Sequence, residues 1–270
     1  AKIERTEAIT NLEEIIFASD AVLIARGDLG VEIGDAELPG LQKLITTKSL
    51  EQNRLVITAT QMMQSMVESP IPTRAEVLDV ANSVFDGTDA VMLSAETAVG
   101  RHPEMVVEAM NRICLGAERH DDTHLHTARL SVQFQRIDQA IAMAAMYMAT
   151  NVSVQAIVAL TESGSTAQWL SRVRSAVPIY ALSRLRDTRR RMALYRGVYP
   201  IAHDIPSTNV EVSLFEGVRL LLQQGRIKVG DRIILTMGQH THNEGGTNSL
   251  RLVQVGEDGY LENNPSLNSH

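Results

Sequence analysis

The sequence contains little of what defines several large classes of protein. Only one of its 270 residues is cysteine, Cys114, which excludes a disulfide framework and a cysteine metal cluster and fits a reducing compartment such as the cytoplasm. No stretch approaches the roughly 18 consecutive apolar residues of a transmembrane helix. The 25 basic and 32 acidic residues give a net charge of −7, which argues against nucleic acid as the main partner because phosphate backbones attract cationic surfaces. The first residues, Ala-Lys-Ile-Glu, do not form a signal peptide.

The remaining composition is globular, with 44% hydrophobic and 21% charged residues. In the first 120 residues, apolar runs of strand length alternate with segments of helical periodicity. The expected strands are 21–25, 55–58 and 90–93, preceded by a strand tail at residues 2–4. The expected helices are 39–53, 73–85 and 103–119. Close alternation of this kind predicts parallel βα units.

Each of these strands ends in polar or glycine-containing sequence. The tails are Lys2-Ile3-Glu4, Arg26-Gly27-Asp28, Thr58-Ala59-Thr60-Gln61 and Ser94-Ala95-Glu96-Thr97. In a (β/α)8 barrel the active site lies at the carboxyl ends of the strands. The four tails are therefore expected to converge on one pocket.

A second αβ unit follows a polar segment, residues 120–126, which we interpret as a linker; its three histidines and two aspartates lack a regular metal-ligand spacing. Beyond it we expect strands at 154–160, 179–182, 198–201, 232–237 and 250–255, helices that include 137–150 and 209–224, and a frayed tail at 262–270. The predicted domains are 1–113 and 114–270.

The first strand tails carry a charged group suited to phosphoryl chemistry. Lys2 and Glu4 are two residues apart and lie on one face of a strand end, and Asp28 follows the next expected strand. Two carboxylates at strand ends suit a divalent cation that keeps water or substrate oxygens as ligands. A lysine beside them suits a transferring phosphoryl group. A plain surface salt bridge between Lys2 and Glu4 explains the same spacing.

Several ordered motifs are similar to those of pyruvate kinase. They are A-K-I-E, A-R-G-D-L-G-V-E-I, A-T-Q-M-M-Q-S-M, P-T-R-A-E and D-G-T-D-A-V-M-L-S-A-E-T-A, followed by L-T-E-S-G-S-T-A and A-L-Y-R-G-V-Y-P. Each string alone is weak, but their order and spacing are specific. The resemblance implies an α/β chain with the second half of a TIM (β/α)8 barrel and then a three-layer αβ domain with a mostly parallel sheet. The first four strands and the lid domain of the family have no counterpart here.

The resemblance assigns roles to the strand tails. Lys2 matches the lysine that stabilises the transferring phosphoryl group, and Glu4 and Asp28 match the ligands of catalytic Mg²⁺, with Mn²⁺ as a substitute. The implied reaction is phosphoryl transfer from phosphoenolpyruvate to ADP, giving ATP and an enolate that is then protonated to pyruvate. One departure is Gly34, where the family often has proline.

The resemblance also implies a substrate site. Ala25, Arg26 and Gly27, with Asp28, match the loop and helix start whose amides receive the substrate carboxylate. Thr60 matches a threonine near the methylene carbon, implicated in substrate binding and enolate protonation.

Ser94 and Glu96 are expected near the nucleotide. The family also implies a K⁺ ion, whose main ligands are not in this chain, together with a cytoplasmic homotetramer that acts in glycolysis.

A second chemical site is predicted at Thr161, Ser163, Gly164, Ser165 and Thr166. Here a strand enters a loop of hydroxyls and a helix starts directly, an arrangement that favours phosphate but also describes an ordinary capped turn. The resemblance favours an allosteric effector site, which the 238–247 loop would close. That loop lacks the basic residues of members regulated by fructose bisphosphate, so a sugar monophosphate or AMP is the expected effector.

Two other functions remain open. One is a non-catalytic module that binds a phosphorylated effector. The other is a barrel lyase acting on enolates, which fits the carboxylates but not the ordered motifs. Among further residues, Met62, Met63 and Met66 are expected to pack, Cys114 to be inert core, and Arg74 and Glu76 to hold structure or a subunit contact.

Overall fold

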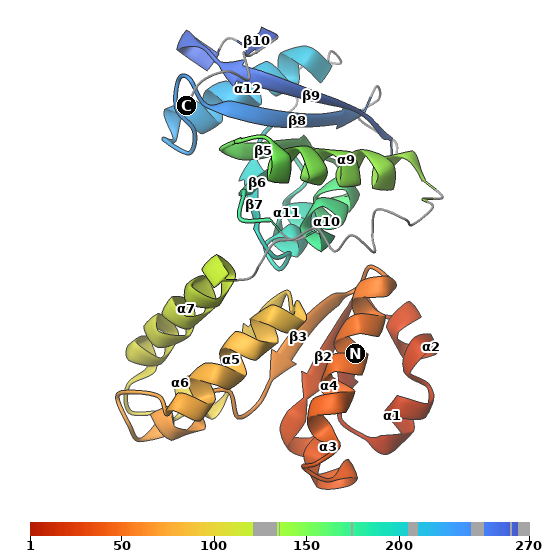
Figure 1. The fold of residues 1–270 in the computed structure, drawn as a ribbon, viewed down its shortest axis with the longest axis vertical. Helices are drawn as coiled ribbons and strands as arrows, with labels where there is room; N and C mark the ends of the chain where they lie inside the picture. The colour runs from red at the N-terminus through yellow and green to blue at the C-terminus, as the bar shows by residue number, and fades with distance from the viewer. Residues whose placement is uncertain are drawn as a thin grey trace. The chain divides into compact units, whose positions relative to one another are not determined.

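The structure is a computed structural model that describes residues 1–120, 134, 136–173, 175–204, 210–238, 246–259 and 261–263. The chain forms two compact units, Ala1–Asp122 and Thr123–His270, and both are visible in Figure 1. The boundary expected between residues 113 and 114 falls inside a helix that continues to His120. Within the described ranges, no helix is both long and apolar enough to cross a membrane.

The first unit alternates strands and helices. Its elements are β1 (Lys2–Ile3), α1 (Thr6–Thr10), α2 (Leu12–Phe17), β2 (Ala21–Ala25), α3 (Arg26–Ile33), α4 (Leu38–Glu51), β3 (Leu55–Ala59), η1 (Gln64–Val67), α5 (Arg74–Asp86), β4 (Ala90–Met92), α6 (Ala95–Ala98) and α7 (Pro103–His120). The four strands pair in parallel in the order β1-β2-β3-β4. Because parallel strands point the same way, their carboxyl ends share one edge of the sheet.

Local sequence explains several of these boundaries. Thr73 caps α5: its hydroxyl accepts a hydrogen bond from the Glu76 amide, and Glu76 accepts one from the Thr73 amide, which together form a capping box. Gly87 ends the same helix in the left-handed conformation, with φ of 100°, which glycine adopts without a steric penalty. The core between β1–β3 and α2–α4 contains Ile3, Ile16, Val22, Ile24, Leu29, Ile45 and Val56.

The second unit is a six-stranded sheet with helices on both faces. Its elements are α9 (Ile137–Asn151), β5 (Ala156–Leu160), α10 (Ser165–Arg172), β6 (Ile179–Ser183), α11 (Arg186–Met192), β7 (Val198–Ala202), α12 (Val210–Gln223), β8 (Arg232–Gly238), β9 (Thr247–Val255), η2 (Glu257–Gly259) and β10 (Leu261–Asn263). The strand order is β10-β9-β8-β5-β6-β7. The strands β8, β5, β6 and β7 are parallel, and β9 and β10 are antiparallel to their neighbours.

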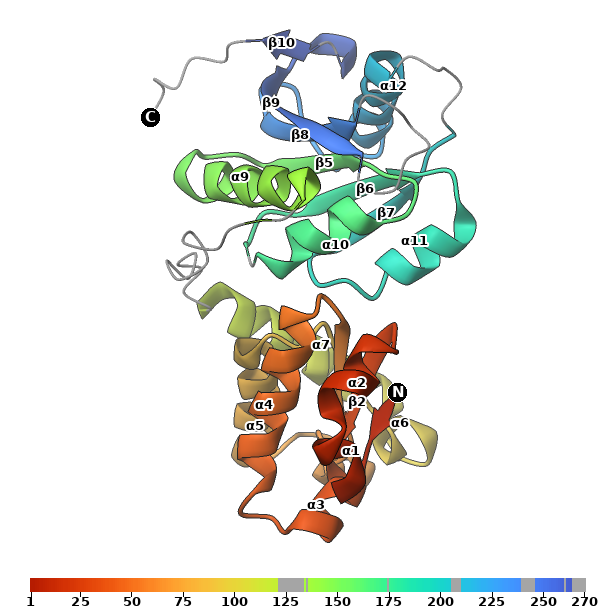
Figure 2. The same ribbon diagram turned by 90° about the vertical axis from the view of Figure 1, so that its right-hand side faces the viewer.

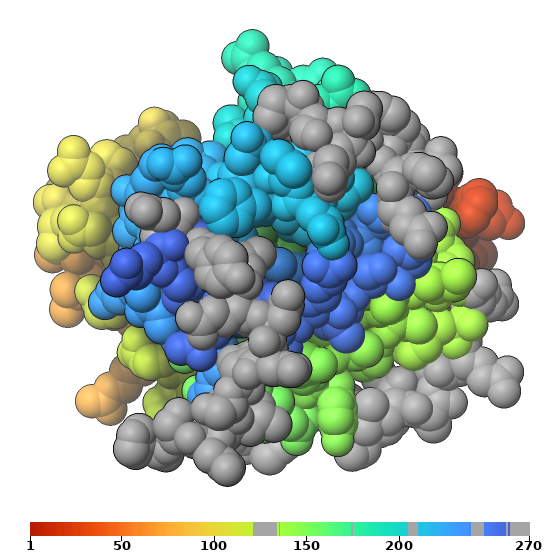
Figure 3. Space-filling view, turned by 90° about the horizontal axis from the view of Figure 1, so that it is seen from above, coloured from red at the N-terminus to blue at the C-terminus, as the bar shows by residue number. Residues whose placement is uncertain are grey.

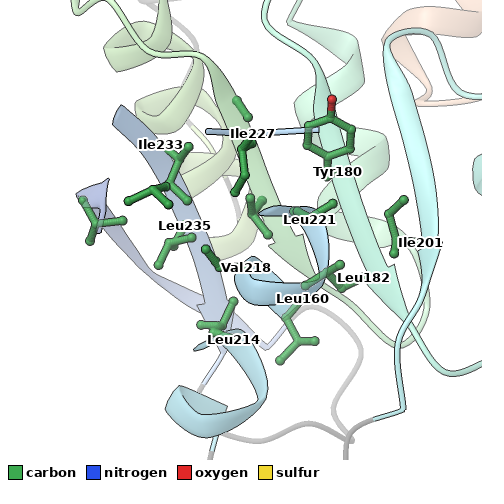
Figure 4. Close-up of a cluster of buried hydrophobic side chains, with 14 of the residues drawn as sticks. Leu160, Tyr180, Leu182, Ile201, Leu214, Val218, Leu221, Ile227, Ile233 and Leu235 are labelled. Carbon is green, nitrogen blue, oxygen red and sulfur yellow. The ribbon is translucent and has the colours of Figure 1, made fainter. Parts of the chain in front are cut away.

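The two faces of this sheet are covered by different helices (Figure 2). The helix α12 packs Leu214, Val218 and Leu221 onto one face, against residues such as Val158 and Leu235 (Figure 4). The helices α9 and α10 pack on each other, and α9 also packs on β8 and β9. Both α12 and β9 reach the surface of the unit (Figure 3). This is the three-layer arrangement with a mostly parallel sheet that we predicted.

The structure corrects the expected elements at two points. Residues Leu261–Asn263 pair with β9 as strand β10, where we expected only a frayed tail. Of the expected linker 120–126, His120 ends α7, and residues 121–126 lie outside the described part of the chain.

Candidate functional site

The three charged residues of the first strand tails contact one another. The Lys2 ammonium lies 3.1 Å from Asp28 Oδ2 and also forms an ion pair with Glu4. Hydrogen bonds with Glu4 and Asp28 raise the pKa of Lys2 above its ordinary value, and the hydrogen bond from Lys2 lowers the pKa of Asp28. Lysine and aspartate therefore both remain charged near neutral pH.

The local fold explains why these residues meet. Lys2 lies in β1, which pairs with β2, and α3 begins directly after β2, so Asp28 falls in its first turn. An acidic group is favoured there by the helix dipole. The side chains of Lys2 and Asp28 thus meet, coming from the ends of two neighbouring strands, as predicted from the sequence.

The two carboxylates fit a divalent cation. Glu4 and Asp28 contact the same ammonium group, so their oxygens converge on one small region, and carboxylate oxygens are the ligands that Mg²⁺ prefers. The described residues contain no group of three or more His, Cys, Asp or Glu that could hold a metal. Two carboxylates would leave the other coordination positions of such an ion to water or substrate oxygens.

Thr60 connects the ends of β2 and β3. Its hydroxyl accepts a hydrogen bond from the Gly27 amide at 2.8 Å and donates to the Ala59 carbonyl at 2.6 Å. Thr60 and Gln61 have φ values of 67° and 52°, which are rare for non-glycine residues and most unfavourable for a β-branched one. Backbone strain of this kind is concentrated at functional sites.

Arg26 has a structural role that the sequence reasoning missed. Its buried guanidinium donates to both carboxylate oxygens of Asp79, at 2.7 and 2.6 Å, and to the Thr60 carbonyl at 2.8 Å. The guanidinium therefore fixes the strained turn after β3. Any contribution of Arg26 to a substrate site would come from its backbone.

Glu96 also serves the structure of the site. Its carboxylate is buried, and it accepts hydrogen bonds from the Met63 amide at 3.0 Å and from the Ser94 amide at 2.7 Å. It joins the segment after β3 to the end of β4. The placement of Ser94 and Glu96 near the nucleotide stays a prediction.

The three methionines and Glu76 have the structural role expected of them, whereas Cys114, expected in the core, is only partly buried and Arg74 is exposed. Met62, Met63 and Met66 are fully buried and pack in one core cluster with Val80 and Val106. Glu76 braces η1 as well as α5, because it also accepts from the Ser65 amide at 2.7 Å.

The predicted phosphate loop, residues 161–166, follows β5 in the second unit and includes the first two residues of α10. Gly164 is the N-cap of α10 with φ of 85°. The Gly164 amide donates to the Thr161 hydroxyl at 3.0 Å, and the Ser165 amide donates to the Ser163 hydroxyl at 3.3 Å. Two hydroxyl groups of the loop thus accept hydrogen bonds from its own backbone amides. A bound anion would place its oxygens where these hydroxyl oxygens now lie.

Neighbouring elements support this loop. The hydroxyls of Thr166 and Thr247 are 2.5 Å apart, which joins the first turn of α10 to the start of β9. A Cβ atom at Gly164 would lie 3.1 Å from Met192 Cγ, so α11 packs closely on the loop. Of the loop expected to close over this site, Gly238, Gly246 and Thr247 are described, and His240 and His242 lie outside the described residues.

Comparisons with known proteins agree with these features. The family model of the pyruvate kinase barrel domain matches residues 1–107, and that of the pyruvate kinase alpha/beta domain matches residues 139–253. Pyruvate kinase II of Salmonella typhimurium is 51% identical over 259 residues, which cover 94% of this chain and 54% of that protein. Pyruvate kinase of Haemophilus influenzae is 49% identical over 242 residues, covering 88% of this chain and 50% of that protein.

A solved structure is likewise similar to nearly the whole of this chain. The crystal structure of a pyruvate kinase from Cryptosporidium parvum matches with a TM-score of 0.85 and 35% identity, covering 94% of this chain and 50% of that chain. The chain spans about half the length of the relatives it matches. The two family models match in order and together account for both units, and the chain therefore belongs to the pyruvate kinase family.

Proposed function

We propose that the first unit supplies phosphoryl-transfer chemistry: the magnesium-dependent transfer of the phosphoryl group of phosphoenolpyruvate to ADP, which gives pyruvate and ATP. The observation that carries this proposal is the contact of Lys2 with Glu4 and Asp28 at adjacent strand ends.

Each residue has a role that follows from its chemistry. Glu4 and Asp28 would hold Mg²⁺, or Mn²⁺ in its place, and the bound ion would neutralise charge on phosphoryl oxygens. Lys2 would stabilise the phosphoryl group as the bond from phosphorus to the enolate oxygen breaks and a bond to an ADP oxygen forms. The carbon of the released enolate then takes a proton.

The Gly27 amide would receive the substrate carboxylate at the start of α3, where the helix dipole favours an anion. This amide currently donates to the Thr60 hydroxyl at 2.8 Å. The Thr60 hydroxyl would therefore lie next to the bound substrate, in agreement with a role in binding or in enolate protonation. Family membership also supports a K⁺ ion, a cytoplasmic homotetramer and a role in glycolysis.

The direct test is a coupled assay of pyruvate formation from phosphoenolpyruvate and ADP with Mg²⁺. Asp28→Ala should abolish magnesium-dependent turnover, because the ion loses one of its two carboxylates. Asp35→Ala is the matched control, since Asp35 lies beyond α3 with an exposed side chain. Normal turnover of Asp28→Ala at ordinary magnesium concentration would refute the assignment.

The second candidate function is binding of a phosphorylated effector by residues 161–166. The left-handed Gly164 at the N-cap of α10 supports it, together with the hydroxyls that surround that helix start. A sugar monophosphate or AMP is the proposed ligand. Ser165→Asp would place a negative charge where the phosphate is expected and should remove the response to every such ligand.

These two functions can be separated in one preparation. If the 270-residue chain forms no pyruvate but binds AMP or a sugar phosphate, it acts as a non-catalytic effector-binding module. If it forms pyruvate, the catalytic proposal holds for the chain itself.

A further inference from the structure

A buried carboxylate lies beside the phosphate loop. The side chain of Asp138 is 1% exposed, whereas its partner Arg136 is 52% exposed. Arg136 donates from Nε to Oδ1 at 3.0 Å and from Nη2 to Oδ2 at 2.8 Å. The Ser165 hydroxyl donates to the same Oδ2 at 3.4 Å. A guanidinium and a hydroxyl of the proposed effector site therefore share one carboxylate oxygen.

The position of Asp138 makes its charge important for anion binding. Asp138 is in the first turn of α9, and its amide neighbour Gln139 donates to Oδ1 at 3.1 Å. Ser165 is the first residue of α10. Asp138 thus lies where the positive ends of two helix dipoles meet, and its charge is favoured there. A phosphate at the start of α10 would bring a second anion to that place.

We propose that the Arg136–Asp138 pair sets the phosphate affinity of residues 161–166. Asp138 opposes an incoming phosphate by its charge and by holding the Ser165 hydroxyl, and Arg136 offsets most of that opposition. This inference rests on the proposed effector site. It assigns a positioning role to Asp138 and makes Arg136 the cation that permits an anion to bind next to a buried acid.

The proposal has a consequence that a purely structural ion pair does not share. Asp138→Asn keeps the size of the side chain and removes the opposing charge, so it should tighten phosphate binding. Arg136→Gln leaves the buried carboxylate uncompensated and should weaken binding. If Asp138 only fastened α9 to α10 through Ser165, and Arg136 only held Asp138 in place, loss of either side chain would loosen the loop and both variants would bind more weakly.

The experiment uses the full chain and the fluorescence of Trp169, the one tryptophan of the sequence, which lies in α10. AMP, glucose 6-phosphate and inorganic phosphate are titrated at low and at moderate salt. One charge acting over about 6–10 Å at an effective dielectric of about 40, between the values for a protein surface and for water, predicts a change of about fourfold to tenfold in Kd for each variant, in opposite directions. The effect should shrink at higher salt.

Matched controls lie at the amino ends of the parallel strands of the same sheet, opposite to the phosphate loop. Asp231→Asn and Arg232→Gln make the same chemical changes at the start of β8, and they should leave Kd within about twofold because they are far from the carboxyl ends of the strands. Arg136→Lys keeps the positive charge and loses the paired geometry. It should bind nearly as well as the wild type, and binding as weak as that of Arg136→Gln would overturn the proposal.

The outcomes separate this inference from the effector site itself. If the wild type binds none of the three ligands, or if Ser165→Asp binds as the wild type does, the effector site is wrong and this inference falls with it. If the wild type binds and Ser165→Asp does not, but Asp138→Asn fails to tighten binding, only this inference is overturned. Should Asp138→Asn fail to fold by circular dichroism, the contrast between Arg136→Gln and Arg136→Lys decides.

Discussion

The two sheets of the molecule differ in how completely they are covered. In the second unit every residue of β5 and β6 is buried. In the first unit Val22 and Ile24 are buried by the helices, whereas Leu23 and Ile57 remain partly exposed and Met92 is 37% exposed. A three-layer sheet is covered by helices on both faces, but the inner face of a barrel is covered only by the other strands of the barrel.

This difference separates a sheet that helices cover on both faces from a sheet with one face that stays partly exposed in the described residues. The edge strands of both sheets pair on one side only in the described residues, β1 and β4 in the first unit and β7 and β10 in the second, so the two sheets differ in how their faces are covered. The sheet of the first unit carries Lys2 and the ends of β3 and β4, so the site proposed for catalysis is built on the less covered sheet. The site proposed for regulation is built on the more covered one.

The largest effect should follow from Lys2→Met in the active enzyme. The change removes the charge that contacts Glu4 and Asp28, and preorganised charges of this kind are worth a factor of at least about 10³ in kcat. KM for phosphoenolpyruvate should change less. A steep rise in KM with unchanged kcat would make Lys2 a binding residue only. If Lys2→Met also weakened effector binding, measured by Trp169 fluorescence, the two units would not have separate functions.

Amide hydrogen exchange tests directly whether the sheet of the first unit is less well covered than the sheet of the second unit. Amides of β5 should exchange at least about tenfold more slowly than those of β4 in the 270-residue chain, because exposed, singly paired strands open more readily. The chain should also bind the dye ANS through the partly exposed apolar face. Equal protection of β4 and β5, with no ANS signal, would show that the first unit is as well covered as the second.

Gly100→Ala should destabilise the first unit by about 2–3 kcal/mol, as overpacking does. A Cβ atom at Gly100 would lie 2.1 Å from the Glu96 carbonyl oxygen, a backbone atom that cannot move alone. Gly40→Ala is the matched control: in α4 a Cβ atom there meets nothing within 4 Å, and alanine is favoured over glycine in a helix by up to about 1 kcal/mol. Urea unfolding should therefore move in opposite directions for the two variants, and parallel shifts would contradict the packing argument.

Much of this architecture is visible in the sequence because burial leaves a clear pattern. The run Ala21–Ala25 was predicted with the bounds that β2 has, since five consecutive apolar residues before a polar tail indicate a buried parallel strand. Thr73 was likewise predicted at the start of a helix, where its side chain forms a capping box. These signals depend on residues that are adjacent in the chain.

The features that sequence reasoning missed depend on distant partners. The role of the Arg26 guanidinium is set by Asp79, 53 residues away, and no local pattern indicates that pair. The helix α3 includes two glycines, Gly27 and Gly30, which lower its intrinsic propensity. The short strand β10 exists because residues 261–263 pair with β9.

A smaller effect in the first unit is a loss of folding stability at low pH, to which Glu76 contributes. Partial burial pushes the pKa of Glu76 up, but the hydrogen bonds from Ser65 and Thr73 together outweigh it, so the pKa lies below its ordinary value of 4.5. A carboxyl group with a lowered folded-state pKa stabilises the fold fully above its unfolded value, and this stability is lost as pH falls through the folded value. The sensitive window therefore lies below pH 4.5.

Glu76→Gln should be less stable than the wild type at pH 7, and the difference in free energy of unfolding should diminish as pH falls below 4.5. Urea denaturation between pH 7 and pH 3 measures it. Glu104→Gln removes one acid from an exposed position in α7 and controls for net charge. A difference that grows toward low pH would reverse the sign of this argument.

The smallest effect should arise in the well-covered second unit, from Thr236→Val. The Thr236 hydroxyl in β8 is fully buried and has no hydrogen-bond partner among the described residues, so it keeps a desolvation cost without a compensating bond. Valine has nearly the same shape without that cost, and the variant should be more stable by about 1 kcal/mol. Thr166→Val is the matched change at a buried hydroxyl that does have a partner, Thr247, and it should be less stable by about 1 kcal/mol. Thermal unfolding of both variants gives the comparison, and a loss of stability in Thr236→Val equal to that in Thr166→Val would mean that the Thr236 hydroxyl is satisfied in solution.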